Sequence, residues 1–200
     1  MIEFVYFDLG KVLFDFDYTR LTDQIIQKSK LDKHQLASML WDDTLIVRYE
    51  TGEFSTEEFL SLIKRRFALE ETLASIKEAW LDIFDPLSEN LAAATETLEK
   101  TRVGVLSNTS PSHFEYLSTL HPFLRDQRIV PILSYEKRVR KPDEAIFRQA
   151  MRSAEVPSQN ILYFDDLQDN VDAAKRLGWK AYQVTPELSL RQVLIAHGIL

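Results

Sequence analysis

The stretch FVYFDLGKVLFDFD, residues 4–17, determines how the rest of the sequence is interpreted. Four apolar or aromatic residues lead directly into Asp8, the chain turns at Gly10, and a second apolar run precedes Asp15 and Asp17. A single aspartate after a strand is often a turn former. It can also belong to a site, because ligands of open parallel sheets bind at the carboxyl ends of the strands. The ends of the other strands decide between these interpretations.

Further strand-like segments are short, rich in β-branched or aromatic residues, and bounded by turn formers. Their nearly continuous apolar character is typical of strands covered on both faces, as in a parallel sheet. Helical patterns separate the later ones, which predicts an α/β, Rossmann-like fold with helices on both faces of the sheet. We expect strands at residues 3–8, 102–107, 129–134, 160–165 and 180–184, and helices near 111–120, 142–154 and 170–178.

The segment after the first strand breaks this alternation. Between Tyr18 and Leu87 we find no strand-like run, whereas helical periodicity recurs several times. STEEF, starting at Ser55, is typical of a helix start with a capping box. We therefore expect residues 17–87 to form a small α-helical domain inserted into a core made of residues 1–16 and 88–200.

Composition and charge exclude several classes of site and partner. The chain has 200 residues and no cysteine, which excludes disulfides, thiolate nucleophiles and cysteine-bound zinc. A formal net charge of −7 predicts no general attraction to nucleic acid or to an anionic membrane. No apolar run reaches the roughly 18 residues that span a bilayer, and the N-terminus lacks a basic signal-peptide region. We expect a cytoplasmic protein, and the sequence does not predict its oligomeric state.

Polar residues end three of the expected strands. Asp8 ends the first, Ser107 and Asn108 end the second, and Asp165 and Asp166 end the fourth. Carboxylates brought together repel one another and are costly to remove from water, so a cation is needed to hold them ionised. Oxygen ligands without cysteine or clustered histidine favour Mg²⁺. The sequence therefore predicts a magnesium site at one edge of the sheet.

Along the chain lie, in order, DLGKV at 8–12, LSN at 106–108, KPDEAIF at 141–147 and FDD at 164–166. These four motifs resemble those of the haloacid dehalogenase superfamily. The helical insertion after the first motif resembles the cap domain of that superfamily, so the resemblance covers essentially the whole chain. With Gly10 after FDL, the first motif resembles that of a branch of the superfamily that carries FDLG in place of FDLD. Some members of that branch are sugar-phosphate phosphatases. The resemblance implies a magnesium-dependent phosphatase that acts on a small phosphorylated metabolite, with a sugar phosphate favoured.

The resemblance also implies roles for the acidic residues. Asp8 would attack phosphorus and form an aspartyl-phosphate, which divides a difficult step into two easier ones. Asp8, the backbone carbonyl of Gly10 and Asp166 would hold Mg²⁺. Asp165 would orient a metal-bound water.

For the phosphate, the resemblance implies that Ser107 and the backbone amide of Asn108 bind the phosphoryl oxygens. Lys141 would neutralise the nucleophile and the transferring group, charge stabilisation of the kind that phosphoryl transfer requires. This role separates Lys141 from its basic neighbours, which are typical of a solvated loop: Lys137, Arg138 and Arg140.

Gly10 departs from the pattern of most phosphatases of the superfamily, which have a second aspartate there to protonate the leaving group. Losing a general acid typically costs about 10²–10⁴-fold in rate. The substrate could have a good leaving group, such as an anomeric sugar hydroxyl, or Asp15, Asp17 or a cap residue could supply the proton. Asp15 and Asp17 are more typical of the hinge between core and cap.

Two further hypotheses stay open. The protein could be a dehalogenase that attacks carbon, although such an enzyme needs no metal and has no use for the adjacent Asp165 and Asp166. It could also be a weakly active or non-catalytic binding or regulatory protein that keeps the fold, which the glycine at position 10 makes worth testing.

The expected cap offers candidate substrate contacts. They are Arg20 near the hinge, Trp41, Arg48 and Tyr49. Each has a structural alternative: Trp41 lies at helical spacing from apolar residues, which is typical of a core position, and Arg48 is typical of a surface ion-pair partner.

Overall fold

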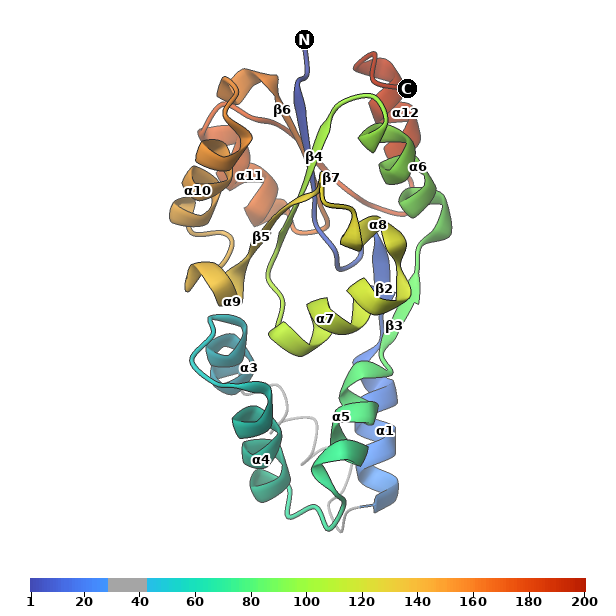
Figure 1. The fold of residues 1–200 in the computed structure, drawn as a ribbon, viewed down its shortest axis with the longest axis vertical. Coiled ribbons are helices and arrows are strands. Elements are labelled where there is room, and N and C mark those ends of the chain that lie inside the picture. Colours follow the sequence, from blue (N-terminus) through green and yellow to red (C-terminus); the bar gives the residue numbers. More distant parts are fainter. Residues whose placement is uncertain (29–42) are drawn as a thin grey trace.

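A five-stranded parallel sheet forms the centre of the core in the computed structural model, which describes residues 1–28 and 43–200 (Figure 1). The strand order is β5-β4-β1-β6-β7, so the strand that begins the chain lies in the middle. All five expected strands are present, and the predicted α/β class is confirmed. The strands are β1 (Phe4–Phe7), β4 (Arg102–Ser107), β5 (Val130–Leu133), β6 (Ile161–Asp165) and β7 (Lys180–Gln183).

Helices cover both faces of this sheet (Figure 1). Apolar residues of α6, α7, α8 and α12 pack on one face, and those of α10 and α11 pack on the other. The predicted helices are confirmed, although α10 begins two residues after the expected Pro142. The core helices are α6 (Ser88–Leu98), α7 (Pro111–Leu120), α8 (Pro122–Arg125), α9 (Ser134–Lys137), α10 (Glu144–Ala154), the 3-10 turn η1 (Ser158–Asn160), α11 (Gln168–Arg176) and α12 (Leu190–Ala196).

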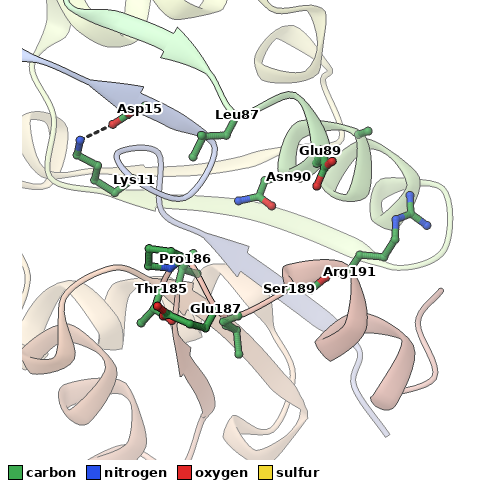
Figure 2. Close-up of a pocket in the computed structure, with 13 residues that line it drawn as sticks. Lys11, Asp15, Leu87, Glu89, Asn90, Thr185, Pro186, Glu187, Ser189 and Arg191 are labelled. Carbon is green, nitrogen blue, oxygen red and sulfur yellow. Dashed lines mark hydrogen bonds and ion pairs between the residues drawn. The ribbon is translucent and has the colours of Figure 1, made fainter.

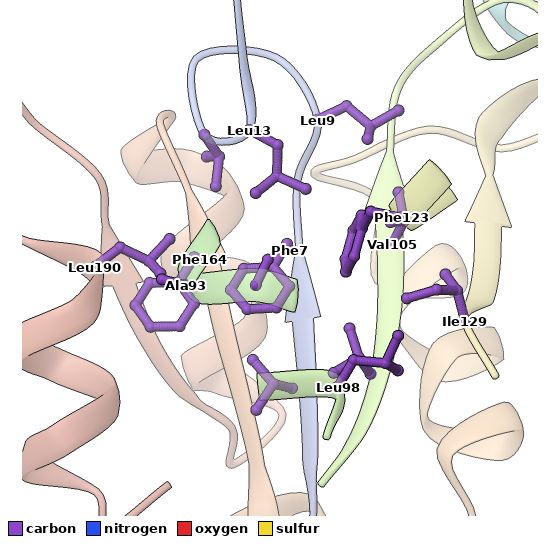
Figure 3. Packing of buried hydrophobic residues seen from close by; sticks show 14 of the residues in the cluster. Phe7, Leu9, Leu13, Ala93, Leu98, Val105, Phe123, Ile129, Phe164 and Leu190 are labelled. Atoms are coloured by element: carbon purple, nitrogen blue, oxygen red, sulfur yellow. The ribbon is translucent and has the colours of Figure 1, made fainter. Parts of the chain in front are cut away.

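The four residues of β1 show why the sequence reads as continuously apolar. Successive side chains of a strand point to opposite faces. Val5 and Phe7 accordingly join the cluster under α6 and α12, while Phe4 and Tyr6 join the cluster under α10 and α11. Figure 3 shows the first cluster, in which the rings of Phe7 and Phe164 stack with centroids 5.5 Å apart. Both faces of the strand are buried in apolar clusters, and this packing holds the end of the strand in place.

Two short antiparallel strands connect the core with the inserted helices. β2 (Phe14–Phe16) pairs with β3 (Phe84–Pro86). The prediction that no strand lies between Tyr18 and Leu87 is therefore wrong. The three residues of β3 have no alternating pattern and end on proline, and they form a strand because β2, far away in the sequence, supplies the pairing partner.

The inserted helices pack around an apolar cluster of their own, which includes Tyr49, Phe59 and Trp80. The capping box is present, since the Ser55 hydroxyl accepts a hydrogen bond from the Glu58 amide and the Glu58 carboxylate accepts one from the Ser55 amide. No helix among the described residues is long and apolar enough to cross a membrane. Among the described residues, the inserted helices are α1 (Tyr18–Lys28), α3 (Asp43–Glu50), α4 (Thr56–Arg66) and α5 (Leu73–Leu81).

Candidate active site

The register of the sheet brings three strand ends together. Phe7 of β1 lies beside Val105 of β4 and Phe164 of β6. The next residue along β1, Asp8, continues this register, because its amide donates a 2.9 Å hydrogen bond to the carbonyl of Phe164. The carboxylate of Asp8 therefore meets that of Asp165, which ends β6, and Ser107 ends the strand on the other side.

Lys141 lies between two of the carboxylates. Its Nζ is 3.0 Å from Asp8 Oδ2 and 2.6 Å from Asp165 Oδ2, and it donates a 2.9 Å hydrogen bond to the carbonyl of Leu106. The Lys141 side chain is 1% exposed, so it is a buried ammonium and no part of the solvated basic loop. A buried charge requires partners of this kind.

Asn108 holds the backbone that carries Lys141. Its Oδ1 accepts a 2.8 Å hydrogen bond from the Lys141 amide, and its Nδ2 donates a 3.0 Å hydrogen bond to the Lys141 carbonyl. Sequence reasoning considered only the backbone amide of Asn108 and missed this contact, because it joins segments 33 residues apart.

Two further residues hold Asp165 and were also missed. The Tyr163 hydroxyl donates to Asp165 Oδ2, and Asn170 Nδ2 donates a 2.9 Å hydrogen bond to Asp165 Oδ1. The contact of Tyr163 could have been predicted from the sequence, because Tyr163 and Asp165 are two residues apart in a strand and therefore share a face. Asn170 lies in the predicted helix after the FDD motif, within reach of the strand end.

Burial and charge set the protonation of the site. Burial raises the pKa of Asp8 to about 7, an effect that the Lys141 charge opposes and the Asp165 charge reinforces. Burial would also raise the pKa of Asp165, but the Lys141 charge and hydrogen bonds bring it below its ordinary value. Burial lowers the pKa of Lys141, yet Asp165 and Asp8 together raise it. The site therefore contains an ion pair between Lys141 and Asp165, beside the Asp8 carboxyl, which keeps its proton until near neutral pH.

The carboxylates suit a divalent cation. One oxygen each from Asp8, Asp165 and Asp166 lies within 4.8 Å of the others. Burial, and then the neighbouring Asp165, raise the pKa of Asp166. Hard oxygen donors whose ionisation is penalised in this way are the ligands expected for Mg²⁺.

A side chain at position 10 would collide with Phe16 unless the phenyl ring moved. A Cβ on Gly10 would lie 2.8 Å from Cε1 of Phe16, so the phenyl ring lies where an aspartate would begin. Asp15 is exposed and paired with Lys11, and that hydrogen bond lowers its pKa. Hydrogen bonds from Thr19 lower the pKa of Asp17. Both aspartates border the β2–β3 connection. Because the pKa of each is lowered, both are ionised near neutral pH and have no proton to donate.

The candidate substrate contacts of the inserted helices lie in different environments. Arg20 pairs with Asp85 at the β2–β3 connection. Arg48 is half exposed and pairs with Glu53 at 2.7 Å, and Trp41 lies outside the described residues.

Tyr49 is fully buried, and its hydroxyl donates a 2.9 Å hydrogen bond to Ser112 Oγ at the start of α7. The indole nitrogen of Trp80 donates to the same oxygen at 3.1 Å. These bonds attach the inserted helices to the core.

A cavity of about 920 Å³ lies beside β2 and the segment after β7 (Figure 2). Lys11 and Asp15 line one side of it, while Thr185, Pro186 and Glu187 line the other. Neither Lys141 nor the three clustered carboxylates contribute to its lining. The lining of this cavity therefore includes none of the clustered carboxylates, although the charge of Lys11 also acts on Asp166.

Comparison with known proteins agrees with this geometry. Residues 2–178 match the family of haloacid dehalogenase-like hydrolases, and the chain belongs to that family. It is 27% identical, over 97% of both chains, to a D-ribitol-5-phosphate phosphatase of Bacteroides thetaiotaomicron.

Solved structures with the same fold include two from bacteria. One is the HAD family enzyme bt-2542 of Bacteroides thetaiotaomicron in complex with magnesium and inorganic phosphate, with a TM-score of 0.86, 22% identity, and coverage of 96% of this chain and 99% of that one. The other is a predicted HAD-like family hydrolase from Porphyromonas gingivalis, with a TM-score of 0.84, 24% identity and 98% coverage of both chains.

Proposed function

We propose that this protein is a magnesium-dependent phosphatase that hydrolyses a small phosphomonoester, with a sugar phosphate favoured, through an aspartyl-phosphate on Asp8. The observation that carries the proposal is the buried cluster in which Lys141 lies between Asp8 and Asp165. The similarity to a D-ribitol-5-phosphate phosphatase over nearly the whole chain supports this substrate class.

The chain's own residues perform the first step as follows. A carboxylate oxygen of Asp8 attacks phosphorus while the bond from phosphorus to the leaving oxygen breaks, and the leaving oxygen takes up a proton from water. Lys141 keeps its charge throughout and offsets the negative charge of the transferring group. Ser107 and the amide of Asn108 bind the phosphoryl oxygens. A water molecule then attacks the phosphorus of the aspartyl-phosphate, which releases inorganic phosphate and regenerates the Asp8 carboxylate.

Asp8, Asp166 and the backbone carbonyl of Gly10 would hold the Mg²⁺, with Asp165 beside them. A bound Mg²⁺ supplies positive charge that keeps Asp8 ionised and polarises a phosphoryl oxygen. Without such a cation, burial leaves Asp8 protonated up to about pH 7.

We further propose that residues 17–87 form a cap over this site. The separate apolar cluster of the inserted helices supports a domain of its own, and the β2–β3 pair supports a connection on which it is carried. A cap of this kind excludes water and contacts the part of the substrate that does not react.

The alternative is a weakly active or non-catalytic binding protein, which the Phe16 ring over Gly10 favours because it excludes the usual acid. Hydrolysis of p-nitrophenyl phosphate distinguishes the two, since its leaving group needs almost no acid. We expect magnesium-dependent turnover that Asp8→Asn abolishes. No turnover by the wild-type protein would favour the binding protein.

The substrate class is tested with a panel of phosphorylated metabolites, with released phosphate as the readout. We expect activity on sugar or alditol phosphates. Activity confined to phosphopeptides would contradict the small-metabolite proposal, and release of halide from a 2-haloacid would support the dehalogenase hypothesis instead.

A further inference from the structure

In an in-line phosphoryl transfer the leaving oxygen lies opposite the attacking one. Asp8 attacks from the end of β1, so the leaving group points away from the sheet. The inserted helices lie beyond this edge of the sheet (Figure 1). Residues where these helices meet the core therefore face the non-reacting part of a substrate.

One series of contacts leads from the nucleophile to that region. Phe16 packs over Gly10, two residues after Asp8. The Phe16 ring meets the ring of Tyr18 edge-on, with centroids 5.4 Å apart. Tyr18, the first residue of α1, also packs against Trp80 of α5, with centroids 6.2 Å apart. Tyr18 thus lies between the nucleophile loop and the inserted helices.

A second series begins at Lys141. The preceding residue, Arg140, pairs with Glu50 at the end of α3, with Nη2 3.2 Å from Oε2. The Glu50 side chain is 15% exposed. Among the described residues, Arg140 Nε is buried without a hydrogen-bond partner. A buried donor without a partner is costly, and a ligand atom would satisfy it.

The two series converge. Burial, and then the charge of Glu50, raise the pKa of Tyr18, while the charge of Arg140 lowers it. All three groups are therefore close enough to act on one another, and the Tyr18 hydroxyl stays protonated as a donor. We define Tyr18, Glu50 and Arg140 as the leaving-group cluster.

We propose that the leaving-group cluster selects a neutral polyhydroxylated phosphomonoester, an alditol or sugar phosphate, against one that carries a second anionic group. This inference rests on the proposed function. Hydroxyl groups can donate to the Glu50 carboxylate and accept from Arg140 and Tyr18. A second anion would face the Glu50 charge where few waters screen it, and Glu50 already neutralises Arg140.

The test uses two probes that differ at one end only: D-ribitol 5-phosphate has a hydroxymethyl group where D-ribonate 5-phosphate has a carboxylate. We expect the wild-type protein to prefer the ribitol ester at least about tenfold in kcat/KM. Glu50→Gln keeps the shape and removes the charge, so it is expected to reduce that preference at least about tenfold. Because both substrates meet the same variant, a general loss of activity cancels in the ratio.

Arg138→Asn is the matched control. Arg138 lies on the same loop as Arg140 and donates a 3.1 Å hydrogen bond to the Gly52 carbonyl, so its loss also weakens the contact between loop and inserted helices. Asparagine tolerates the left-handed backbone at this position, where φ is 54°. We expect this variant to keep the wild-type preference and its turnover of p-nitrophenyl phosphate.

The outcomes of this experiment test the cluster, the polyol assignment and the proposed function separately. An unchanged ratio in Glu50→Gln, or an equal change in Arg138→Asn, would overturn the role of the cluster. A wild-type protein that hydrolyses p-nitrophenyl phosphate but prefers the ribonate ester, or accepts neither ester, would overturn the polyol assignment alone. Absence of magnesium-dependent p-nitrophenyl phosphate turnover would instead contradict the proposed function, and this inference with it.

Discussion

Replacing Asp8 by asparagine is expected to abolish turnover and, at the same time, to make the metal-free protein more stable. The two effects have one cause. Asp8 is buried beside Asp165, and burial raises its pKa from 3.8 to about 7. Ionised Asp8 therefore lowers the free energy of unfolding of the metal-free protein. Asparagine has nearly the same shape and no charge, so it avoids this loss.

The size and sign follow from the two pKa values. Between pH 3.8 and about 7 the folded protein keeps the Asp8 proton while the unfolded chain loses it, so the free energy of unfolding falls as the pH rises. Each pKa unit corresponds to about 1.4 kcal/mol, which gives about 4 kcal/mol above pH 7. The gain of the variant is expected to stay below this value, since asparagine also weakens the interaction with Lys141.

The assay is urea unfolding in EDTA, with wild-type protein and variant compared at about pH 4 and about pH 8. We expect a difference of a few kcal/mol at the higher pH that shrinks towards the lower one. Asp15→Asn is the control, because Asp15 is exposed and its hydrogen bond with Lys11 lowers its pKa, so its loss is expected to bring no gain. A variant of Asp8 no more stable than wild type at about pH 8 would refute this account of the site's electrostatics.

Lys141→Met is expected to lower the free energy of unfolding by about 3–5 kcal/mol at neutral pH and to abolish turnover, because Asp8 and Asp165 lose their buried counter-ion; urea unfolding with unchanged stability would contradict this. Gly10→Asp, which introduces the missing acid, is expected to cost about 1–3 kcal/mol and to lower turnover, because its Cβ meets the Phe16 ring; a faster, equally stable variant would show that the ring yields. Asp166→Asn is expected to raise the Mg²⁺ concentration for half-maximal turnover at least about tenfold, measured by titration after EDTA treatment; an unchanged midpoint would exclude Asp166 as a ligand.

Local pattern was enough to predict the sheet and the polar residues at its edge. Each buried strand is a short apolar run closed by a turn former, and parallel strands deliver their carboxyl ends to one side. Asp8 and Asp165 therefore had to meet once their strands were adjacent. The short strand β3 escaped prediction, because its existence depends on pairing with β2, and pairing is invisible in a three-residue pattern.

The sequence by itself determined which residue types reach the edge of the sheet, since hydrophobic periodicity and turn residues are local properties of the chain. Only the tertiary structure decided how those residues are held: the Asn108 amide on the Lys141 backbone, the Tyr163 hydroxyl on Asp165, and Glu50 on Arg140. The first and last of these contacts join distant segments, and all depend on side-chain rotamers that packing selects. No local pattern encodes that choice.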